Sequence, residues 1–166
     1  MDTRYSPAVA KLPPLSNDIV AELNAIRGGF NTALGLVFIS ADYDEVVAEL
    51  EVGPQHHQPY GLVHGGVYSA MVETLASVGA ALNLGALGLH TVGLDNNTSF
   101  LKAVRTGTLR GTARPLSRGR RTQVWEVSIT NDDELVAAGR VRLLGVQQGA
   151  TMAGEVVDFK HPGPQR

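Results

Sequence analysis

One acidic residue stands in the middle of a long apolar stretch of this chain. Between Gly65 and Leu94 the only charged side chain is that of Glu73. If this stretch is helical, Ser69, Glu73 and Ser77 share one face, because residues four apart are neighbours on an α-helix. Burying an unpaired carboxylate costs several kcal/mol. We therefore expect Glu73 either to take part in chemistry or to meet a basic partner or solvent at an oligomer edge.

The segment directly before this stretch could bind negative charge. It runs from Gln58 to Gly66 and ends in His64-Gly65-Gly66, at the predicted start of the helix. Helix N-termini offer unbonded backbone N–H groups and a positive dipole end, and glycines let a substrate approach the backbone closely. An oxyanion site followed two turns later by a carboxylate on the matching face suggests acyl transfer. The alternative is that the two glycines only form a turn.

A second candidate site is strongly basic. Seven positive and no negative side chains lie between Asn96 and Trp125, namely Lys102, Arg105, Arg110, Arg114, Arg118, Arg120 and Arg121. Arg110 and Arg114 fit the solvated face of a strand. The segment from Ser117 to Thr122 differs, because it places three guanidinium groups and two hydroxyls in one predicted hairpin, which suits phosphate oxygens. Nucleic acid is not the expected partner, since exposed aromatic residues do not alternate with the arginines.

The composition excludes several classes of site. The chain has 166 residues, 43% of them hydrophobic, a formal charge of −2 and no cysteine. The absence of cysteine excludes disulfides, thiolate zinc sites, iron–sulfur clusters and a cysteine nucleophile. The histidines His56, His57 and His64 fit no zinc-ligand spacing, so we expect no metal. The sequence also lacks a Gly-x-Ser-x-Gly elbow and any nucleotide-binding loop.

The apolar and turn-forming segments predict a single α+β domain over residues 16–146, with residues 1–15 and 147–166 poorly ordered. In chain order we expect a helix from residue 16 to the Gly28-Gly29 pair, strands over 34–39 and 45–52, a helix over 65–84, and a meander of strands over 91–104, 108–116, 122–130 and 135–145. The long helix lacks a wide polar face, so a strongly curved antiparallel sheet must wrap around it. Its glycines, Asn83 and the nearby His90 disfavour a membrane span. With no signal-like segment at the start of this sequence, we expect a cytoplasmic protein.

The run from His64 to Thr74, His-Gly-Gly-Val-Tyr-Ser-Ala-Met-Val-Glu-Thr, resembles the signature of the hotdog-fold acyl-CoA thioesterases. The resemblance is closest to the group that includes the phenylacetate-pathway and 4-hydroxybenzoyl-CoA thioesterases. It rests on the acid nine positions after His64 and on Gln58 six positions before it. Ser77 falls where that group more often carries a threonine. The order of elements matches from about Gly29 to Val146.

This resemblance implies a role for each candidate residue. Glu73 is the nucleophile or the general base, and the Gly65 N–H binds the oxyanion. Gln58 orients the thioester, Ser77 places the water, and His64 holds the loop rather than transferring protons. The residues assigned to binding the substrate and its coenzyme A (CoA) moiety are Gly66, Arg118, Arg120, Arg121 and Thr122.

The resemblance also implies partners and excludes others. The substrate is an aryl- or medium-chain acyl-CoA, CoA is part of that substrate, and no other cofactor or metal is needed. The chain forms a homodimer or homotetramer with active sites at the subunit interface. Two alternatives remain, namely an acyl-CoA binding module without catalysis and a hotdog hydratase or dehydratase. The second is disfavoured, because such enzymes carry a histidine a few residues after the acid, whereas His90 lies well beyond Glu73.

Overall fold

The computed structural model describes residues 12–147, 149–152 and 154–156 of the chain. Most of the two terminal segments for which the sequence predicts poor order, 1–15 and 147–166, lies outside the described residues. The described part of the second segment contains two short strands that the sequence analysis does not predict. These strands, β7 (Thr151–Met152) and β8 (Glu155–Val156), pair with each other and form a separate two-stranded sheet.

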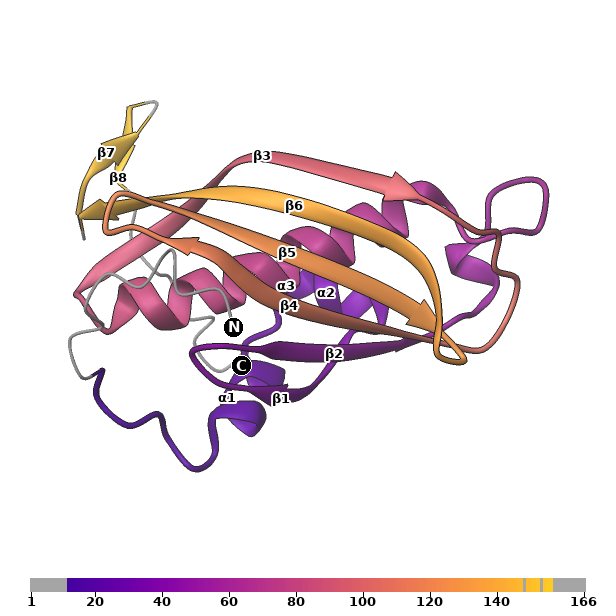
Figure 1. Ribbon diagram of the computed structural model, residues 1–166, viewed down its shortest axis with the longest axis horizontal. Helices are drawn as coiled ribbons and strands as arrows, with labels where there is room; N and C mark the ends of the chain where they lie inside the picture. Colours follow the sequence, from indigo (N-terminus) through magenta and orange to yellow (C-terminus); the bar gives the residue numbers. More distant parts are fainter. Residues whose placement is uncertain (1–11, 148, 153, 157–166) are drawn as a thin grey trace, which may run out of the picture.

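Six antiparallel strands form the main sheet, in the order β1-β2-β4-β5-β6-β3 (Figure 1). In chain order they are β1 (Val37–Ala41), β2 (Val46–Glu51), β3 (Leu89–Phe100), β4 (Thr108–Arg118), β5 (Thr122–Asn131) and β6 (Glu134–Gln147). The β5–β6 turn contains Asp132 (φ 48°) and Asp133 (φ 64°), as the tight hairpin turns of twisted sheets require. The predicted α+β class is confirmed.

The long helix α3 (Gly65–Gly85) packs along the concave face of this sheet. Its buried side includes Met71, Leu75 and Ala76, which belong to one core together with Trp125 and Val127 of β5. By length and composition α3 could cross a membrane, but here its apolar residues face the sheet. The predicted wrapping of an apolar helix by a curved sheet is therefore confirmed, and it leaves the Ser69-Glu73-Ser77 side half-buried.

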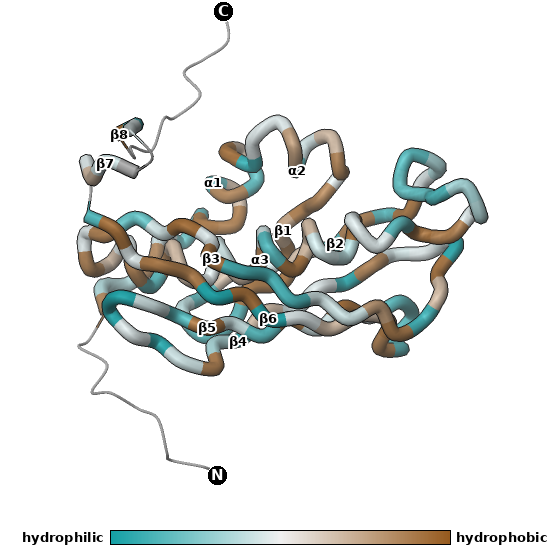
Figure 2. Tube along the Cα trace, turned by 90° about the horizontal axis from the view of Figure 1, so that it is seen from above, coloured by the Kyte–Doolittle hydropathy of each residue, from teal (hydrophilic) through white to brown (hydrophobic). Residues whose placement is uncertain are grey.

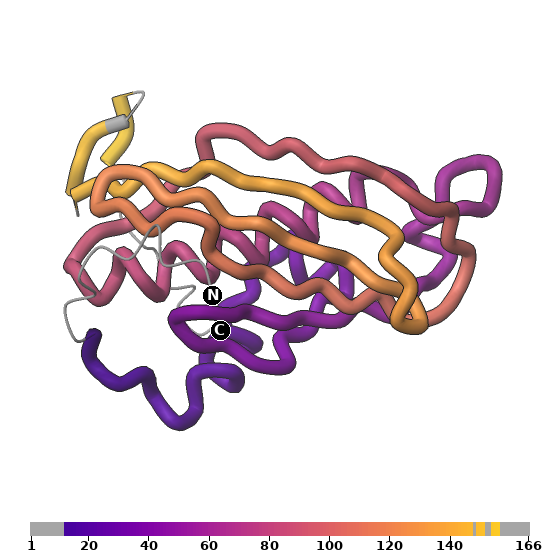
Figure 3. Tube along the Cα trace, viewed as in Figure 1, coloured from indigo at the N-terminus to yellow at the C-terminus, as the bar shows by residue number. Residues whose placement is uncertain are grey.

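The position of β3 corrects the predicted four-strand meander. Only β4, β5 and β6 follow one another across the sheet, whereas β3 lies beside β6 at the far edge, as the chain trace in Figure 3 shows. The link between β3 and β4 is too long for a tight hairpin, and it carries the buried Val104. The N–H groups of Leu101 and Lys102 both donate to the carbonyl of Val136, so the link crosses the end of the sheet instead of reversing.

The N-terminal helical region also differs from its prediction. The first helix, α1 (Ile19–Ala25), ends before the glycine pair, and Gly28 begins a second helix, α2 (Gly28–Leu34). Gly28 has a φ of +73°, which allows the chain to change direction there. In Figure 2, α1 and α2 lie on the opposite side of α3 from strands β4–β6. The Thr74 hydroxyl donates to Asn31 Oδ1 (2.9 Å) and so ties α3 to α2.

The closest approach between α3 and the sheet occurs at Gly79 and gives a stability prediction. A Cβ atom at Gly79 would lie within 2.4–2.8 Å of three ring carbons of Trp125, which is fully buried. We expect Gly79→Ala to destabilise the fold by about 1–3 kcal/mol, as overpacked cores do. Thermal denaturation should show this as a drop of roughly 2–4 °C per kcal/mol.

Gly85→Ala is the matched control, because Gly85 also lies in α3 but has no atom within 4 Å of its Cβ position. At Gly85 the added methyl group should leave the free energy of unfolding unchanged or raise it by about 0.5–1 kcal/mol, because alanine has a higher helix propensity than glycine. Equal melting temperatures for the two variants would contradict the proposed contact between Gly79 and Trp125.

Candidate active site

The N-terminus of α3 presents one backbone donor at the surface of the site. His64 is the N-cap, and its Nδ1 accepts a hydrogen bond from the Gly66 N–H (2.9 Å). This contact occupies the N–H of Gly66, and the role of His64 in holding the loop stays a prediction. The neighbouring Gly65 N–H donates to no acceptor within the described part of the chain. Gly65 is therefore the donor that remains available for an oxyanion.

A cavity of about 510 Å³ opens beside Gly65. It brings together four of the predicted site residues, Gln58, His64, Gly65 and Gly66, with the apolar side chains of Leu62 and Leu101. Its aromatic wall comes from Tyr68 and Phe100, whose ring centroids are 5.9 Å apart. Burial raises the pKa of the Tyr68 hydroxyl above its ordinary value. The cavity thus combines an apolar wall with an amide side chain and a free N–H group.

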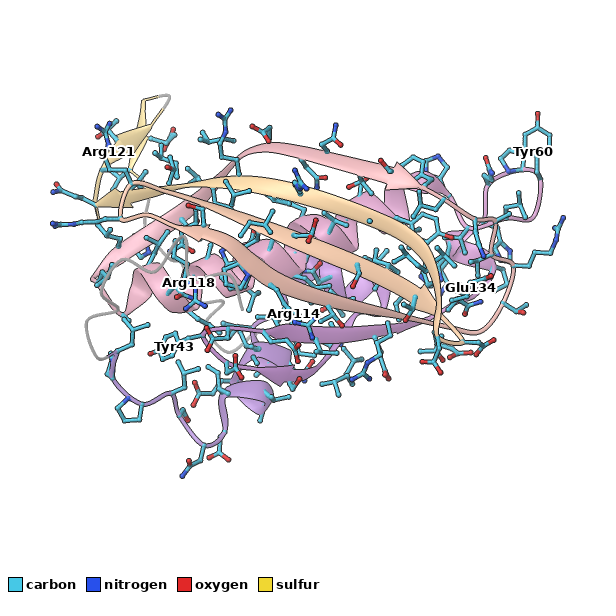
Figure 4. All side chains as sticks on the ribbon, in the orientation of Figure 1. Tyr43, Tyr60, Arg114, Arg118, Arg121 and Glu134 are labelled. Carbon is cyan, nitrogen blue, oxygen red and sulfur yellow. The ribbon has the colours of Figure 1, made fainter. Side chains whose placement is uncertain are left out.

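Gln58 lies in a compact loop that follows the short 3₁₀ helix η1 (Pro54–His56). The Gln58 N–H donates to Leu62 O (2.8 Å), and Gly61 closes the turn with a φ of +70°. Arg105 Nη1 donates to the carbonyls of Tyr60 and Gly61, so this guanidinium fixes the loop. Tyr60 at the loop tip projects away from the body of the molecule (Figure 4).

Glu73 lies in the middle of α3 on its half-buried side, facing strand β3. Its Oε2 accepts from Asn96 Nδ2 (3.0 Å), and its Oε1 lies 3.4 Å from the Ser77 hydroxyl, a long hydrogen bond. A Cβ atom at Gly93 would come within 2.5 Å of Oε1, so the glycine in β3 leaves the room for this oxygen. Among the residues that the structure describes, no cation forms an ion pair with Glu73.

One chain does not bring Glu73 and Gly65 to a common point. Glu73 lies eight positions after Gly65 in the α-helix, a rise of about 12 Å. Neither Glu73 nor Ser77 lines the cavity beside Gly65. A carbonyl carbon under attack must lie about 3 Å from the attacking atom, with its oxygen about 3 Å from the oxyanion donor. The two predicted halves of the site, Gln58 with Gly65 and Glu73 with Ser77, are therefore separate within a single subunit.

Most of the basic segment is neutralised locally. Lys102, Arg110, Arg114 and Arg118 form ion pairs with Glu134, Glu49, Glu45 and Asp44, respectively. Arg118, predicted to bind CoA phosphate, is thus held against the β1–β2 turn. Arg120, Arg121 and Thr122 remain exposed in the β4–β5 hairpin. Figure 4 shows Arg121 and Tyr60 at opposite ends of the sheet, so this hairpin is remote from the cavity of its own chain.

The histidine pair His56-His57 holds loops together. His56 is buried, and its Nδ1 accepts from the Gly53 N–H while its Nε2 contacts Leu34 O (2.9 Å). His57 Nε2 contacts Arg105 O (2.7 Å). Within the described ranges no three His, Cys, Asp or Glu side chains are grouped as metal ligands would be.

Sequence reasoning missed the residues of β3 that surround Glu73. Asn96 donates to Glu73 and to Ser69 O, while the Thr98 hydroxyl donates to Asn96 Oδ1 (2.7 Å). A signal was present, because Asn96 and Thr98 are two apart and therefore share one face of a strand. Sequence periodicity gives no indication that this face meets Glu73, since that depends on how β3 packs against α3.

Comparison with known proteins finds a matching family model and several relatives. Residues 60–138 match the family model of the thioesterase superfamily. The Mycobacterium tuberculosis protein Rv1847, provisionally named an esterase, is 45% identical over 135 residues, which are 80% of this chain and 96% of that protein. The 1,4-dihydroxy-2-naphthoyl-CoA hydrolase of Listeria monocytogenes is 35% identical over 106 residues, which are 64% of this chain and 85% of that protein.

Solved structures show the same relationship. Rv1847 superimposes with a TM-score of 0.70 and 46% identity over 71% of this chain and 96% of that one. Thioesterase HI1161 from Haemophilus influenzae superimposes with a TM-score of 0.75 and 30% identity over 82% of this chain and 94% of that one. The fold, the helix N-terminus with its free donor and these relatives lead to one conclusion: this chain belongs to the thioesterase superfamily, a family of thioester hydrolases with the hotdog fold.

Proposed function

We propose that this protein hydrolyses the thioester of an acyl-CoA, with an aryl acyl group as the first candidate and a medium-chain acyl group as the second. The observation that carries the proposal is Glu73, a half-buried carboxylate that accepts a hydrogen bond from an amide and, in the described part of the chain, pairs with no cation. Two features support an aryl group. The cavity beside Gly65 has an aromatic wall, and the Listeria relative is a hydrolase of an aryl-CoA thioester.

In the proposed reaction the Gly65 N–H stabilises the oxyanion that forms when the thioester carbonyl is attacked. Two routes are consistent with the site. In the first, a Glu73 oxygen bonds to the carbonyl carbon, the C–S bond breaks, CoA leaves as its thiolate, and water then hydrolyses the mixed anhydride. In the second, Glu73 removes a proton from water, whose oxygen attacks instead. Ser77 and Gln58 would place the water and the thioester in either route.

The proposed site is shared between two copies of the chain. Because Gly65 and Glu73 of one subunit are too far apart to act on one carbon, we assign Gly65 and Gln58 from one subunit and Glu73 and Ser77 from a second. Strand β3 is an edge of the sheet, and exposed apolar side chains lie at its middle (Leu94), at its end (Phe100) and directly after it (Leu101). Edge strands with apolar side chains commonly pair with another chain, which makes β3 the proposed contact.

The proposed site for the CoA phosphates is the β4–β5 hairpin. Arg120 and Arg121 are exposed to solvent. Each guanidinium group can therefore donate two parallel hydrogen bonds to the oxygens of one phosphate. Since this hairpin is remote from the cavity of its own chain, it would bind the nucleotide of a substrate held mainly by other subunits. Arg118 is omitted from this role, because it pairs with Asp44.

Release of the CoA thiol, followed with a disulfide reagent, tests the proposal. The protein contributes no background, because it has no cysteine. The substrates should include benzoyl-CoA, phenylacetyl-CoA, 1,4-dihydroxy-2-naphthoyl-CoA and octanoyl-CoA. A benzoyl thioester of N-acetylcysteamine, which lacks the nucleotide, is the matched probe for the basic hairpin.

We expect turnover of at least one aryl-CoA, and a KM that is much higher for the truncated thioester. If the protein binds CoA esters but releases no thiol from any of them, it is a binding module and the proposed hydrolysis is wrong. Equal kcat/KM for the full and the truncated thioester would exclude the hairpin from the site.

A further inference from the structure

The side chain of Asn96 makes three hydrogen bonds, two to the polar side of α3 and one within β3. Its Nδ2 donates to Glu73 Oε2 (3.0 Å) and to the Ser69 carbonyl (3.0 Å). Its Oδ1 accepts from the Thr98 hydroxyl (2.7 Å). Asn96 and Thr98 project from the same face of β3, while Glu73 and Ser69 lie one turn apart on α3. A four-residue network thus connects the edge strand to the candidate catalytic acid.

The chemistry of its partners fixes the orientation of the Asn96 amide. The Ser69 carbonyl and the Glu73 carboxylate can only accept hydrogen bonds, so the NH₂ group must face them. The Thr98 hydroxyl then serves as the donor to Oδ1 on the other side. With Thr98 in place, a rotation of the amide by 180° would turn its oxygen toward two acceptors and lose both bonds.

This network makes the two oxygens of Glu73 unequal. Oε2 is anchored by Asn96. Among the described residues Oε1 has only the long contact to Ser77, and it lies in the space that the missing side chain of Gly93 leaves open. We propose that Asn96, oriented by Thr98, is a positioning residue that anchors Oε2 and so presents Oε1 as the reacting oxygen. This inference rests on the proposed function, because it assigns no role to Asn96 apart from Glu73.

The expected effect lies in the chemical step and not in binding. A carboxylate that is free to rotate spends less time in the attacking geometry, and small misplacements of reacting groups cost up to about 100-fold in rate. Asn96 does not line the cavity, so its loss should leave substrate binding unchanged. Asn96 is exposed in the single chain, and the proposed contact through β3 would remove it from water.

The test compares four variants in the thiol-release assay. Asn96→Leu should lower kcat by about 10- to 100-fold with KM within about twofold of the parent. Thr98→Val should lower kcat by a smaller factor, and Thr98→Ser, which keeps the hydroxyl, should restore it. Asn97→Ala is the matched control, because Asn97 is the neighbour on the opposite face of β3. The melting temperature and the oligomeric state of each variant report on folding and assembly.

The outcomes separate this inference from the proposed function. If the parent hydrolyses acyl-CoA and Glu73→Gln does not, but Asn96→Leu keeps its kcat, only the positioning role is wrong. If Asn97→Ala lowers kcat as much as Asn96→Leu does, the loss comes from a general disturbance of β3. That result would overturn the positioning role of the Asn96 amide. If Thr98→Ser does not recover the kcat that Thr98→Val loses, the proposed role of the Thr98 hydroxyl in orienting Asn96 is wrong. No hydrolysis by the parent would contradict both proposals.

Discussion

Glu73→Gln should abolish thioester hydrolysis while acyl-CoA still binds. The change is isosteric, and the amide oxygen of Gln can still accept from Asn96 Nδ2, so the packing between α3 and β3 is retained. What is lost is the negative charge, and with it the ability to attack a carbonyl carbon or to take a proton from water. We expect kcat to fall by at least about 10³-fold, since loss of such a group commonly has this effect.

Single-turnover thiol release and equilibrium binding of acyl-CoA measure the two properties separately. Glu126→Gln is the matched control, because Glu126 is exposed on β5 and its one ion pair with a described residue is the pair with Arg140 (3.5 Å). It should keep the parental rate. A Glu73→Gln protein that retains full kcat would remove Glu73 from the chemistry, and with it the observation on which the proposed hydrolysis rests.

Gly65→Pro should remove the oxyanion donor with little change to the helix. Proline lacks the N–H group and is tolerated at the first position of a helix, which Gly65 occupies. The preceding residue, His64, has φ −67° and ψ 137°, a conformation that proline accepts in its neighbour. We expect kcat to fall by about 10²–10³-fold, the usual effect of deleting one such donor.

Gly65→Ala is the control for the added carbon atoms. A Cβ atom at this position would lie 2.6 Å from the Phe100 ring, which is 55% exposed and can move aside. Both variants displace that ring, but only proline lacks the N–H group. If Gly65→Ala loses as much activity as Gly65→Pro, the ring and not the backbone donor explains the loss.

Mixing the two inactive variants tests whether the site is shared. In a mixed dimer of Glu73→Gln and Gly65→Pro chains, one site combines the intact Gly65 of the first chain with the intact Glu73 of the second. Random exchange of subunits should therefore restore about a quarter of all sites. If both halves belonged to one chain, no mixture would contain an intact site, and activity would stay at the level of the separate variants.

Local sequence patterns predicted most of the elements, because their causes are local. The apolar run with a single acid specified α3, and the apolar segments between turn-forming residues specified the strands. The eight-residue spacing from Gly65 to Glu73 also determined their separation, since helical rise is fixed. The Gly28-Gly29 pair was misread as the end of one helix because a glycine with positive φ can equally well begin a new direction.

The contacts that the site residues make with other segments were harder to predict from the sequence. The chain order of β3 and β4 suggested that they pair, but the buried Val104 in their link carries the chain across the end of the sheet. Only this placement sets β3 beside α3 in a way that brings Asn96 to Glu73. The sequence likewise predicted Arg118 as a phosphate ligand, but in the fold Arg118 forms an ion pair with Asp44.

The sequence by itself therefore determined the central helix, its lone carboxylate, the glycine donor at its start and the family to which these belong. Helical periodicity and capping act over a few residues, so they can be read from one stretch of chain. The tertiary structure decided which groups meet: Asn96 with Glu73, Arg118 with Asp44, and Gly65 with the cavity. These contacts join residues far apart in the chain, and the packing that selects them depends on the whole core at once.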